Sequence, residues 1–264
     1  MKAVPAFAIG AFREGTVPAA LRASFAASWV HRMPANAAPP IIVAPDGTID
    51  LQWIDGVLRV AGPDKEAKTE TLPAGAMVVG FRFRPAAASA WLRISASEIV
   101  GQRPALEDFW GGKARRLAES VRVDGIRTDA TSIVRSLEAA LIEHAPAAFA
   151  PDRAMQAAYA LIEAGPPAGV PLVPWLARSL GMSERTLRRR FEESFGYGPK
   201  TLDRILRYKR FVRLSRTSAE PTAVLAALVG YSDQAHLVRE SRRLSGVTPR
   251  GRVRATLAAQ RARS

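Results

Sequence analysis

The sequence predicts an α+β N-terminal domain, a curved sheet or barrel with flanking helices, followed by an all-α C-terminal domain with two helix-turn-helix units. Strand and turn patterns dominate roughly the first 125 residues, and two similar helical units follow about fifty residues apart. The excess of basic residues lies almost wholly in the second of these two parts. Residues 1–150 carry 17 Lys and Arg against 15 Asp and Glu, whereas residues 151–264 carry 21 against 9. The predicted domains are therefore 1–148 and 149–264.

Turns that contain glycine or proline delimit the predicted strands of the first domain. Pro45-Asp46-Gly47 predicts a turn, because proline and glycine supply the backbone angles that turns require. Asp55-Gly56 lies between two short apolar runs and predicts a two-residue β-hairpin. The predicted strands are Thr48–Trp53, its hairpin partner Val57–Val60, and Met77–Phe83.

Helical patterns flank these strands. Ser95 and Glu98 form a capping-box pattern, which is typical of the start of a helical turn. Thr131–His144 has apolar residues at helical spacing, and its predicted buried face consists of Ile133, Leu137, Leu141 and Ile142. The remaining predicted segments are the helix Ala86–Leu92, the domain boundary at Ala145–Pro151 and the helix Ala154–Ala164.

The first helix-turn-helix unit is predicted between Leu172 and Phe195. Gly181 can adopt a left-handed conformation and end the supporting helix, and Ser183 is placed to cap the next helix. The predicted inward residues are Leu176, Ala177 and Leu180 on the supporting helix, and Leu187, Phe191 and Phe195 on the second helix. A different, exposed face carries Arg185, Arg188 and Arg189. Each of these guanidinium groups can bind guanine in a major groove or clamp a phosphate.

The second unit, between Thr222 and Leu244, repeats this pattern. Gly230 is expected to end its supporting helix and Ser232 to cap the next one. The predicted inward residues are Leu237, Ser241 and Leu244, and the outward ones are Gln234, Ala235, His236, Val238, Arg239 and Arg242. Glutamine can pair with adenine, arginine with guanine, and small apolar side chains can contact a thymine methyl group.

A helix predicted over Lys200–Arg216 connects the two units. Seventeen residues at ~1.5 Å each span ~25 Å, so this rod can set two helices into successive major-groove segments about 34 Å apart. Ile205, Leu206, Phe211 and Leu214 are expected to pack it against both units, and Arg210 is a candidate phosphate contact.

These residues resemble the AraC/XylS family of bacterial transcription regulators, over about Arg153 to Arg254. The most specific matches are Leu176-Ala177 to Ser183, Leu187–Phe191, Gly196–Pro199, Arg207, Gly230-Tyr231-Ser232 and Gly246–Pro249. The chain departs from the family at Ser241, where an aromatic or apolar residue is usual. This departure predicts a looser core in the second unit.

The resemblance implies a sequence-specific DNA-binding transcription regulator whose partner is double-stranded DNA. It places base-reading positions on Arg185, Arg188 and Arg189 in the first unit, and on Gln234, Ala235, His236 and Arg239 in the second. Thr186, Arg242 and Arg243 complete the candidate DNA-binding residues.

The first domain is similar, over shorter patches, to sensor domains attached to some members of this family. The patches are Pro45–Trp53, Gly80–Pro85 and Leu106–Gly111. They imply an effector- or partner-binding domain, so the candidate partners include a small-molecule effector, a second copy of the chain in a homodimer, and RNA polymerase. The alternatives are an architectural DNA-binding protein whose first domain only dimerises, and an enzyme fused to a DNA-binding domain.

Two further patterns bear on a cavity in the first domain. Arg82 and Arg84 alternate with phenylalanines on a predicted strand. Two exposed arginines on the outer face are favoured over an arginine that lines a cavity for an anionic effector. Trp53 and Trp91 are expected in the buried core rather than in a cavity wall.

The composition argues against an enzyme, a metal site and a cofactor. The chain has no cysteine, and His31, His144 and His236 lack the spacing of metal ligands. No nucleophile motif or phosphate-binding glycine loop is present. No run of about eighteen apolar residues exists, so neither a spanning helix nor a membrane partner is expected, and the predicted location is the cytoplasm.

Overall fold

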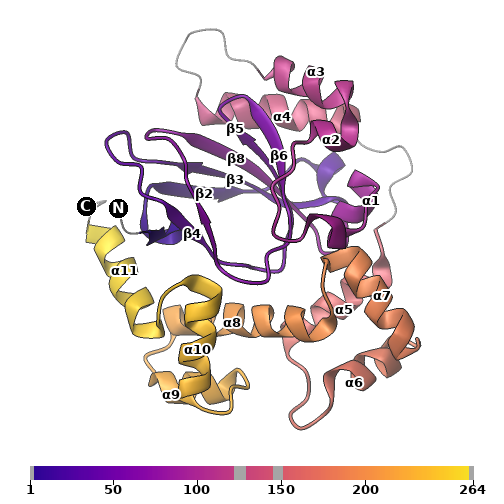
Figure 1. Ribbon diagram of the computed structural model, residues 1–264, viewed down its shortest axis with the longest axis vertical. Coiled ribbons are helices and arrows are strands. Elements are labelled where there is room, and N and C mark those ends of the chain that lie inside the picture. Colours follow the sequence, from indigo (N-terminus) through magenta and orange to yellow (C-terminus); the bar gives the residue numbers. More distant parts are fainter. Residues whose placement is uncertain (1–2, 122–128, 145–150, 262–264) are drawn as a thin grey trace.

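A computed structural model describes residues 3–121, 129–144 and 151–261 of the chain. Strands and short helices form the N-terminal part, and helices alone form the C-terminal part (Figure 1). This arrangement confirms the predicted fold class. The predicted boundary between the domains falls in residues 145–150, which lie outside the described residues.

Two sheets form the N-terminal domain. The larger one is antiparallel and has the strand order β2-β3-β8-β5-β6. Its strands are β2 (Ala11–Gly15), β3 (Phe25–Arg32), β5 (Asp50–Ile54), β6 (Val57–Ala61) and β8 (Met77–Phe83). The smaller sheet consists of β1 (Val4–Pro5), β4 (Ile41–Val43) and β7 (Lys68–Glu70), in the order β1-β4-β7. The predicted hairpin is confirmed: Asp55 and Gly56 both have positive φ and join β5 to β6.

The two faces of the larger sheet have different roles because side chains alternate along each strand. One face packs under helices, and Trp53, Phe81 and Phe83 are buried there with Trp91. The expected core position of both tryptophans is thus confirmed. The opposite face carries Trp29 and Arg82 and faces the smaller sheet.

Short helices cover the first face (Figure 1). They are η2 (Ala19–Leu21), α1 (Ala88–Leu92), η3 (Ala96–Ile99), α2 (Glu107–Trp110), α3 (Gly112–Ser120) and α4 (Ala130–His144), while η1 (Ala6–Ala8) follows β1. The predicted capping box opens η3, where Ser95 and Glu98 make both reciprocal bonds. In α4, Leu137 and Leu141 are buried as predicted, but Ile142 is 42% exposed, because its position points away from the sheet.

Seven helices form the described C-terminal domain, and the first six of them share one core. They are α5 (Arg153–Ala164), α6 (Leu172–Ser179), α7 (Glu184–Phe195), α8 (Pro199–Thr217), α9 (Thr222–Leu228), α10 (Gln234–Ser245) and α11 (Pro249–Arg261). The first unit is α6–α7 and the second unit is α9–α10. The two units lie at opposite ends of α8, which matches the predicted connecting helix (Figure 1).

The turns of the two units differ by one residue. In the first unit Gly181 has a φ of 62° and the Ser183 side chain caps α7 by accepting a bond from Thr186 N, as predicted. In the second unit Gly230 has a φ of 87°, but Asp233 caps α10 by accepting from His236 N at 2.6 Å. The prediction of Ser232 as the cap was wrong, because this turn contains one additional residue.

The second unit has a polar core where the first has phenylalanine. Ser241 is fully buried, and its hydroxyl donates to Val247 O at 2.7 Å and lies 3.2 Å from the Tyr208 hydroxyl. The Tyr208 hydroxyl also donates to Ser245 Oγ at 2.8 Å. The hydroxyl groups of Tyr208, Ser241 and Ser245 are thus hydrogen-bonded to one another and to Val247 O. The looser core expected from Ser241 stays a prediction.

Candidate DNA interface and interdomain cavity

The outer face of α7 carries the three arginines predicted from the sequence. Arg185, Arg188 and Arg189 are exposed. Arg188 lies 3.4 Å from Glu184 and Arg189 lies 2.7 Å from Glu193, both as i,i+4 pairs on the surface. Exposed pairs of this kind contribute little free energy, so both guanidinium groups can exchange their carboxylate for another anion.

Thr186 belongs to the helix cap. Its backbone N–H donates to Ser183 Oγ, and its own hydroxyl accepts from the same atom at 2.9 Å. The half-buried Thr186 therefore fixes the first turn of α7, where the outer face begins.

The N-terminal half of α10 presents a mixed surface. Gln234, Ala235 and Arg239 are exposed, as predicted. His236 is half-buried, with its ring packed edge-on against Tyr231 at 5.1 Å and its Nδ1 3.2 Å from Ser232 Oγ. The turn thus holds the imidazole in place, whereas the other side chains are free to reach a partner.

The N-terminal domain holds both of these helices at their C-terminal ends. On α7, Glu193 O accepts a 2.6 Å bond from Ser89 Oγ of α1. On α10, Arg243 donates to Glu66 Oε1 at 2.8 and 2.6 Å, and Arg243 O accepts from Ala67 N at 3.0 Å. The N-terminal ends therefore remain open, and these are the ends that contact bases in helix-turn-helix proteins.

Two predicted DNA contacts have partners within the protein. Arg243 is engaged by Glu66, whereas its neighbour Arg242 is exposed. Arg210 is only 11% exposed and donates to Ile162 O and to Glu163 O. The prediction of a phosphate contact by Arg210 was wrong, because its guanidinium satisfies the open C-terminal carbonyls of α5.

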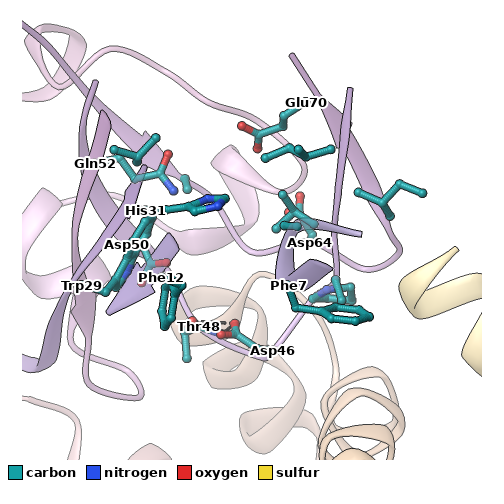
Figure 2. A pocket seen from close by; sticks show the side chains of 18 of the residues that line it. Phe7, Phe12, Trp29, His31, Asp46, Thr48, Asp50, Gln52, Asp64 and Glu70 are labelled. Carbon is teal, nitrogen blue, oxygen red and sulfur yellow. Dashed lines mark hydrogen bonds between the residues drawn. The ribbon is translucent and has the colours of Figure 1, made fainter. Parts of the chain in front are cut away.

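A cavity of about 510 Å³ lies between the two sheets and reaches the C-terminal domain. Its walls come from β2, β3, β4, β5, β6, β7 and β8, from η1 and from the segments that join them. Three residues of the helical domain complete it: Arg216 of α8, Ser245 of α10 and Arg252 of α11. Figure 2 shows the labelled side chains, several of them carboxylates and aromatic rings, around this space.

One end of the cavity holds a balanced set of charges. Glu70 accepts from Arg59 at 2.6 Å and from Arg103 at 2.7 Å, and Arg103 also binds Asp64 at 2.6 Å. Burial opposes the ionisation of Glu70, but the two arginines outweigh it and hold its pKa below the ordinary value. Two carboxylates face two guanidinium groups here, so this end needs no further charge.

The other end holds an unbalanced set. Arg82 lies 2.9 Å from Glu14 and 3.5 Å from each of Asp46 and Asp50. Burial raises the pKa of Asp50 to about 7, although Arg82 lowers it in part. Arg82 thus lines the cavity, contrary to the favoured prediction, whereas the exposed Arg84 donates to Arg22 O. Because Arg82 is already surrounded by carboxylates, it is poorly suited to an anionic ligand.

Aromatic rings form the apolar part of the wall. Trp29 and Phe12 lie 5.8 Å apart on β3 and β2, and Phe7 lies at the rim. The Trp29 ring lies flat against Gly80, where a Cβ atom would come within 2.1 Å of it. Only glycine therefore allows this ring to cover the floor of the cavity.

Sequence analysis did not find the cavity residues. Phe12, Trp29, Asp50 and Glu70 come from four different strands, and only the pairing of those strands brings them together. Within the described residues, no group of three or more His, Asp or Glu side chains is placed to hold a metal ion. None of the described helices is both long and apolar enough to cross a membrane.

Comparisons with known proteins agree with this organisation. Residues 176–254 match the family model described as a helix-turn-helix domain, and residues 17–104 match a domain of unknown function, DUF6597. A chain with two such units on one connecting helix is a DNA-binding transcription regulator. The chain thus carries a DUF6597 domain in front of a helix-turn-helix domain, which agrees with the AraC/XylS resemblance predicted from its sequence.

Solved structures resemble the chain at low identity. ToxT from Vibrio cholerae O395 is 13% identical, with 93% of this chain and 98% of that chain covered and a TM-score of 0.47. The same protein bound to (E)-4-(8-methylnaphthalen-1-yl)but-3-enoic acid is 10% identical, with 93% and 99% covered and a TM-score of 0.48. The AraC-like transcriptional activator CuxR is 17% identical, with 76% and 78% covered and a TM-score of 0.19. No curated protein matches the sequence significantly.

Proposed function

We propose that this protein is a sequence-specific regulator that binds double-stranded DNA through α7 and α10, and that a small effector in the interdomain cavity modulates this binding. The observation that carries the proposal is the cavity itself, because residues of both domains line it. A ligand there touches the sensor domain and the DNA-binding domain at once.

The DNA contact is assigned to the open ends of the two helices. Arg185, Arg188 and Arg189 are exposed on α7, and Gln234, Ala235 and Arg239 are exposed on α10. The first set offers three forked donors for guanine or phosphate, and the second offers one arginine beside glutamine and a methyl group. The excess of 21 basic over 9 acidic residues beyond position 150 supports a polyanionic partner.

The segment from Gly62 to Glu70 supports coupling between the cavity and the second unit. Asp64 and Glu70 line the cavity. Between them, Lys65 O accepts a 2.8 Å bond from Arg204 of α8, and Glu66 binds Arg243 of α10. A ligand that moves this segment changes the hold on α10, and it shifts DNA affinity only if it binds one arrangement better than the other.

The test is selection of bound sites from random DNA duplexes with the full-length protein, followed by affinity measurements on the selected site. We expect affinity to fall steeply with added salt, since counterion release drives binding. Cell-extract fractions that change this affinity contain the effector. The variant Ala44→Trp, which fills the cavity wall, should lose that response, whereas Ala37→Trp on an exposed loop should keep it.

The architectural alternative makes a different prediction. A first domain that only dimerises would show self-association and no response to any fraction. The fully exposed edge strand β2 offers a surface for that association, because its outer hydrogen-bonding groups have no neighbouring strand. Self-association with equal DNA affinity in every fraction would favour this alternative. Contact with RNA polymerase, a homodimer and a cytoplasmic location stay predictions.

A further inference from the structure

We propose that the cavity binds an organic cation, whose ammonium group lies beside Asp50 and against the rings of Phe12 and Trp29. This inference rests on the proposed function only in taking the cavity as the effector site. It names the ligand class from the side chains that line the cavity, seen together in Figure 2.

The charge at one end of the cavity is the first argument. Three carboxylates, those of Glu14, Asp46 and Asp50, share the single guanidinium group of Arg82. With all three ionised, this end carries an excess of two negative charges. Glu14 and Asp46 are 47% and 38% exposed, so water screens much of their charge. Asp50 is the carboxylate to which water has little access, and there a pair with a bound cation is stronger than at the surface.

The position of Asp50 is the second argument. Its side chain is 15% exposed, and Arg82 Nε lies 3.5 Å from its Oδ1, which is too long for a good hydrogen bond. The indole N–H of Trp29 lowers the pKa of Asp50 slightly. Yet among the described residues neither Trp29 Nε1 nor Asp50 Oδ1 reaches hydrogen-bond geometry with a partner. The buried Oδ1 is therefore under-paired, while the exposed part of the Asp50 side chain lines the cavity.

The aromatic wall is the third argument. Phe12 and Trp29 lie next to the unbalanced carboxylates (Figure 2). The face of an aromatic ring attracts a cation, most strongly for tryptophan. The same cavity already has one such contact, because the guanidinium of Arg252 lies 3.9 Å from the centroid of the Phe7 ring.

An anionic ligand finds no comparable site on the sheet side. Arg59 donates to Gln52 and Glu70, and Arg103 donates to Asp64 and Glu70. Arg82 forms ion pairs with its three carboxylates, although among the described residues its Nε, like Asp50 Oδ1, has no hydrogen bond. Each guanidinium group of that wall is thus engaged, and an incoming anion would have to displace a buried carboxylate from it.

The cation site also predicts a pH dependence. The groups that set the ionisation of Asp50 are Arg82 on β8, Asp46 in the preceding turn, Trp29 on β3 and Arg103, with Glu14 on β2 reaching it through Arg82. Because the pKa of Asp50 is raised to about 7, only part of the carboxyl is ionised in the free protein at neutral pH. Cation binding favours the ionised form, so affinity should rise as pH increases through 7.

The experiment uses full-length protein without DNA and three probes with one skeleton: 2-phenylethylammonium, 2-phenylethanol and phenylacetate. Calorimetric titration at pH 8 should show the ammonium binding about tenfold or more tighter than phenylacetate. Asp50→Asn should weaken the ammonium about tenfold, and Phe12→Leu about threefold, since Phe12 is 46% exposed and its loss spares the core. Asp108→Asn, which removes the same charge from the exposed surface of α2, should change nothing.

The pH series separates a charge effect from a folding effect. The ammonium probe keeps its charge between pH 6 and pH 8, so wild-type affinity should rise by about tenfold over that range, whereas Asp50→Asn should show no such rise. Equal or better binding of phenylacetate, equal effects of Asp50→Asn and Asp108→Asn, or no binding of any probe at 10 mM would each overturn the cation assignment.

The proposed function has its own readout. Binding of the ammonium without any change in DNA affinity would leave the ligand class standing and remove effector control. An anion that binds the cavity and changes DNA affinity would support effector control and overturn the assignment of a cationic ligand.

Discussion

The two helix-turn-helix units have the same layout but different interiors and different neighbours. Phe191 fills the position in the first unit that Ser241 fills in the second, fifty residues later, and both are buried. The C-terminal end of α7 packs on α1 and η3, away from the cavity. The C-terminal end of α10 reaches the cavity wall through Ser245 and binds the Gly62–Glu70 segment through Arg243.

This difference separates a unit that lies away from the cavity from one that lies beside it. The first unit contacts the part of the N-terminal domain that is packed around its main core. The second unit contacts the strands and segments that surround the open space. A ligand in the cavity would therefore contact the second unit directly and not the first, and the following substitutions examine that contrast.

The largest effect is expected on the free energy of unfolding, from substitutions in the cores of the two helix-turn-helix units. Phe191→Ala should lower the free energy of unfolding by about 3–5 kcal/mol, because it removes a ring from a fully packed site. Ser241→Ala should cost only about 1–2 kcal/mol, since it removes the bond to Val247 O but leaves little empty volume. Urea unfolding followed by circular dichroism gives both values. Equal losses would mean that the two interiors do not differ in the way described.

The second largest effect is expected on the affinity for DNA, from the loss of base contacts. Arg189→Ala and Arg239→Ala, at equivalent positions of the two units, should each weaken binding to the selected site by about 1–3 kcal/mol. Their effect on random DNA should be smaller. Arg115→Ala, on the exposed surface of α3, is the control and should have no effect. If only Arg189→Ala weakens binding, the second unit does not engage the DNA in the absence of effector.

The caps of α7 and α10 should differ in how their contribution to stability depends on pH. Ser183→Ala should cost about 1 kcal/mol at any pH, because a hydroxyl cap does not titrate. Asp233→Ala should lower stability at pH 7 more than Ser232→Ala does. Bonds from the backbone N–H of His236 and from Ser232 lower the pKa of Asp233, so its contribution is present above the ordinary aspartate pKa and disappears as pH falls through the lowered value.

Thermal unfolding of the three variants at pH 7 and pH 3 measures this contrast. A pH-independent loss for Asp233→Ala, or a larger loss for Ser232→Ala, would restore serine as the cap of the second unit.

The smallest effect is expected at the contact between the domains. Glu66→Gln removes an exposed pair with Arg243 and should cost about 0.2–1 kcal/mol. Glu107→Gln removes a similarly exposed pair within the N-terminal domain and is the matched control. Only Glu66→Gln should also change the affinity for the selected DNA site. No change there would mean that the bond between Ala67 N and Arg243 O is sufficient to hold α10.

The elements that local chemistry determines were predictable from the sequence. Gly181 with Ser183, the Asp55-Gly56 hairpin and the capping box at Ser95 each depend on residues within about four positions. The helix α8 follows from its long helical pattern, and the two inward stripes follow from their spacing. The wrong cap in the second unit came from counting an identical turn length in both units.

The elements that depend on distant partners were not predictable. Arg243 meets Glu66 across 177 positions, so no local pattern indicates that pair. The strand β3 lacks clear alternation with polar residues, because it lies between β2 and β8 in the sheet and is largely buried. The cavity needs the pairing of β2, β3, β5 and β8, and that register appears only in the folded chain.

The bonds among Tyr208, Ser241, Ser245 and Val247 have a consequence for the spacing of DNA sites. Hydrogen bonds depend on angle, so α10 cannot rotate or slide on α8 without breaking both contacts of the Tyr208 hydroxyl, to Ser241 and to Ser245. The apolar contacts of Phe191 and Phe195 have no such directional requirement. The second unit should therefore read its half of a DNA site with α10 at one fixed rotation relative to α8. If the protein tolerates a base pair inserted between the two halves, the first unit should be the one that adjusts.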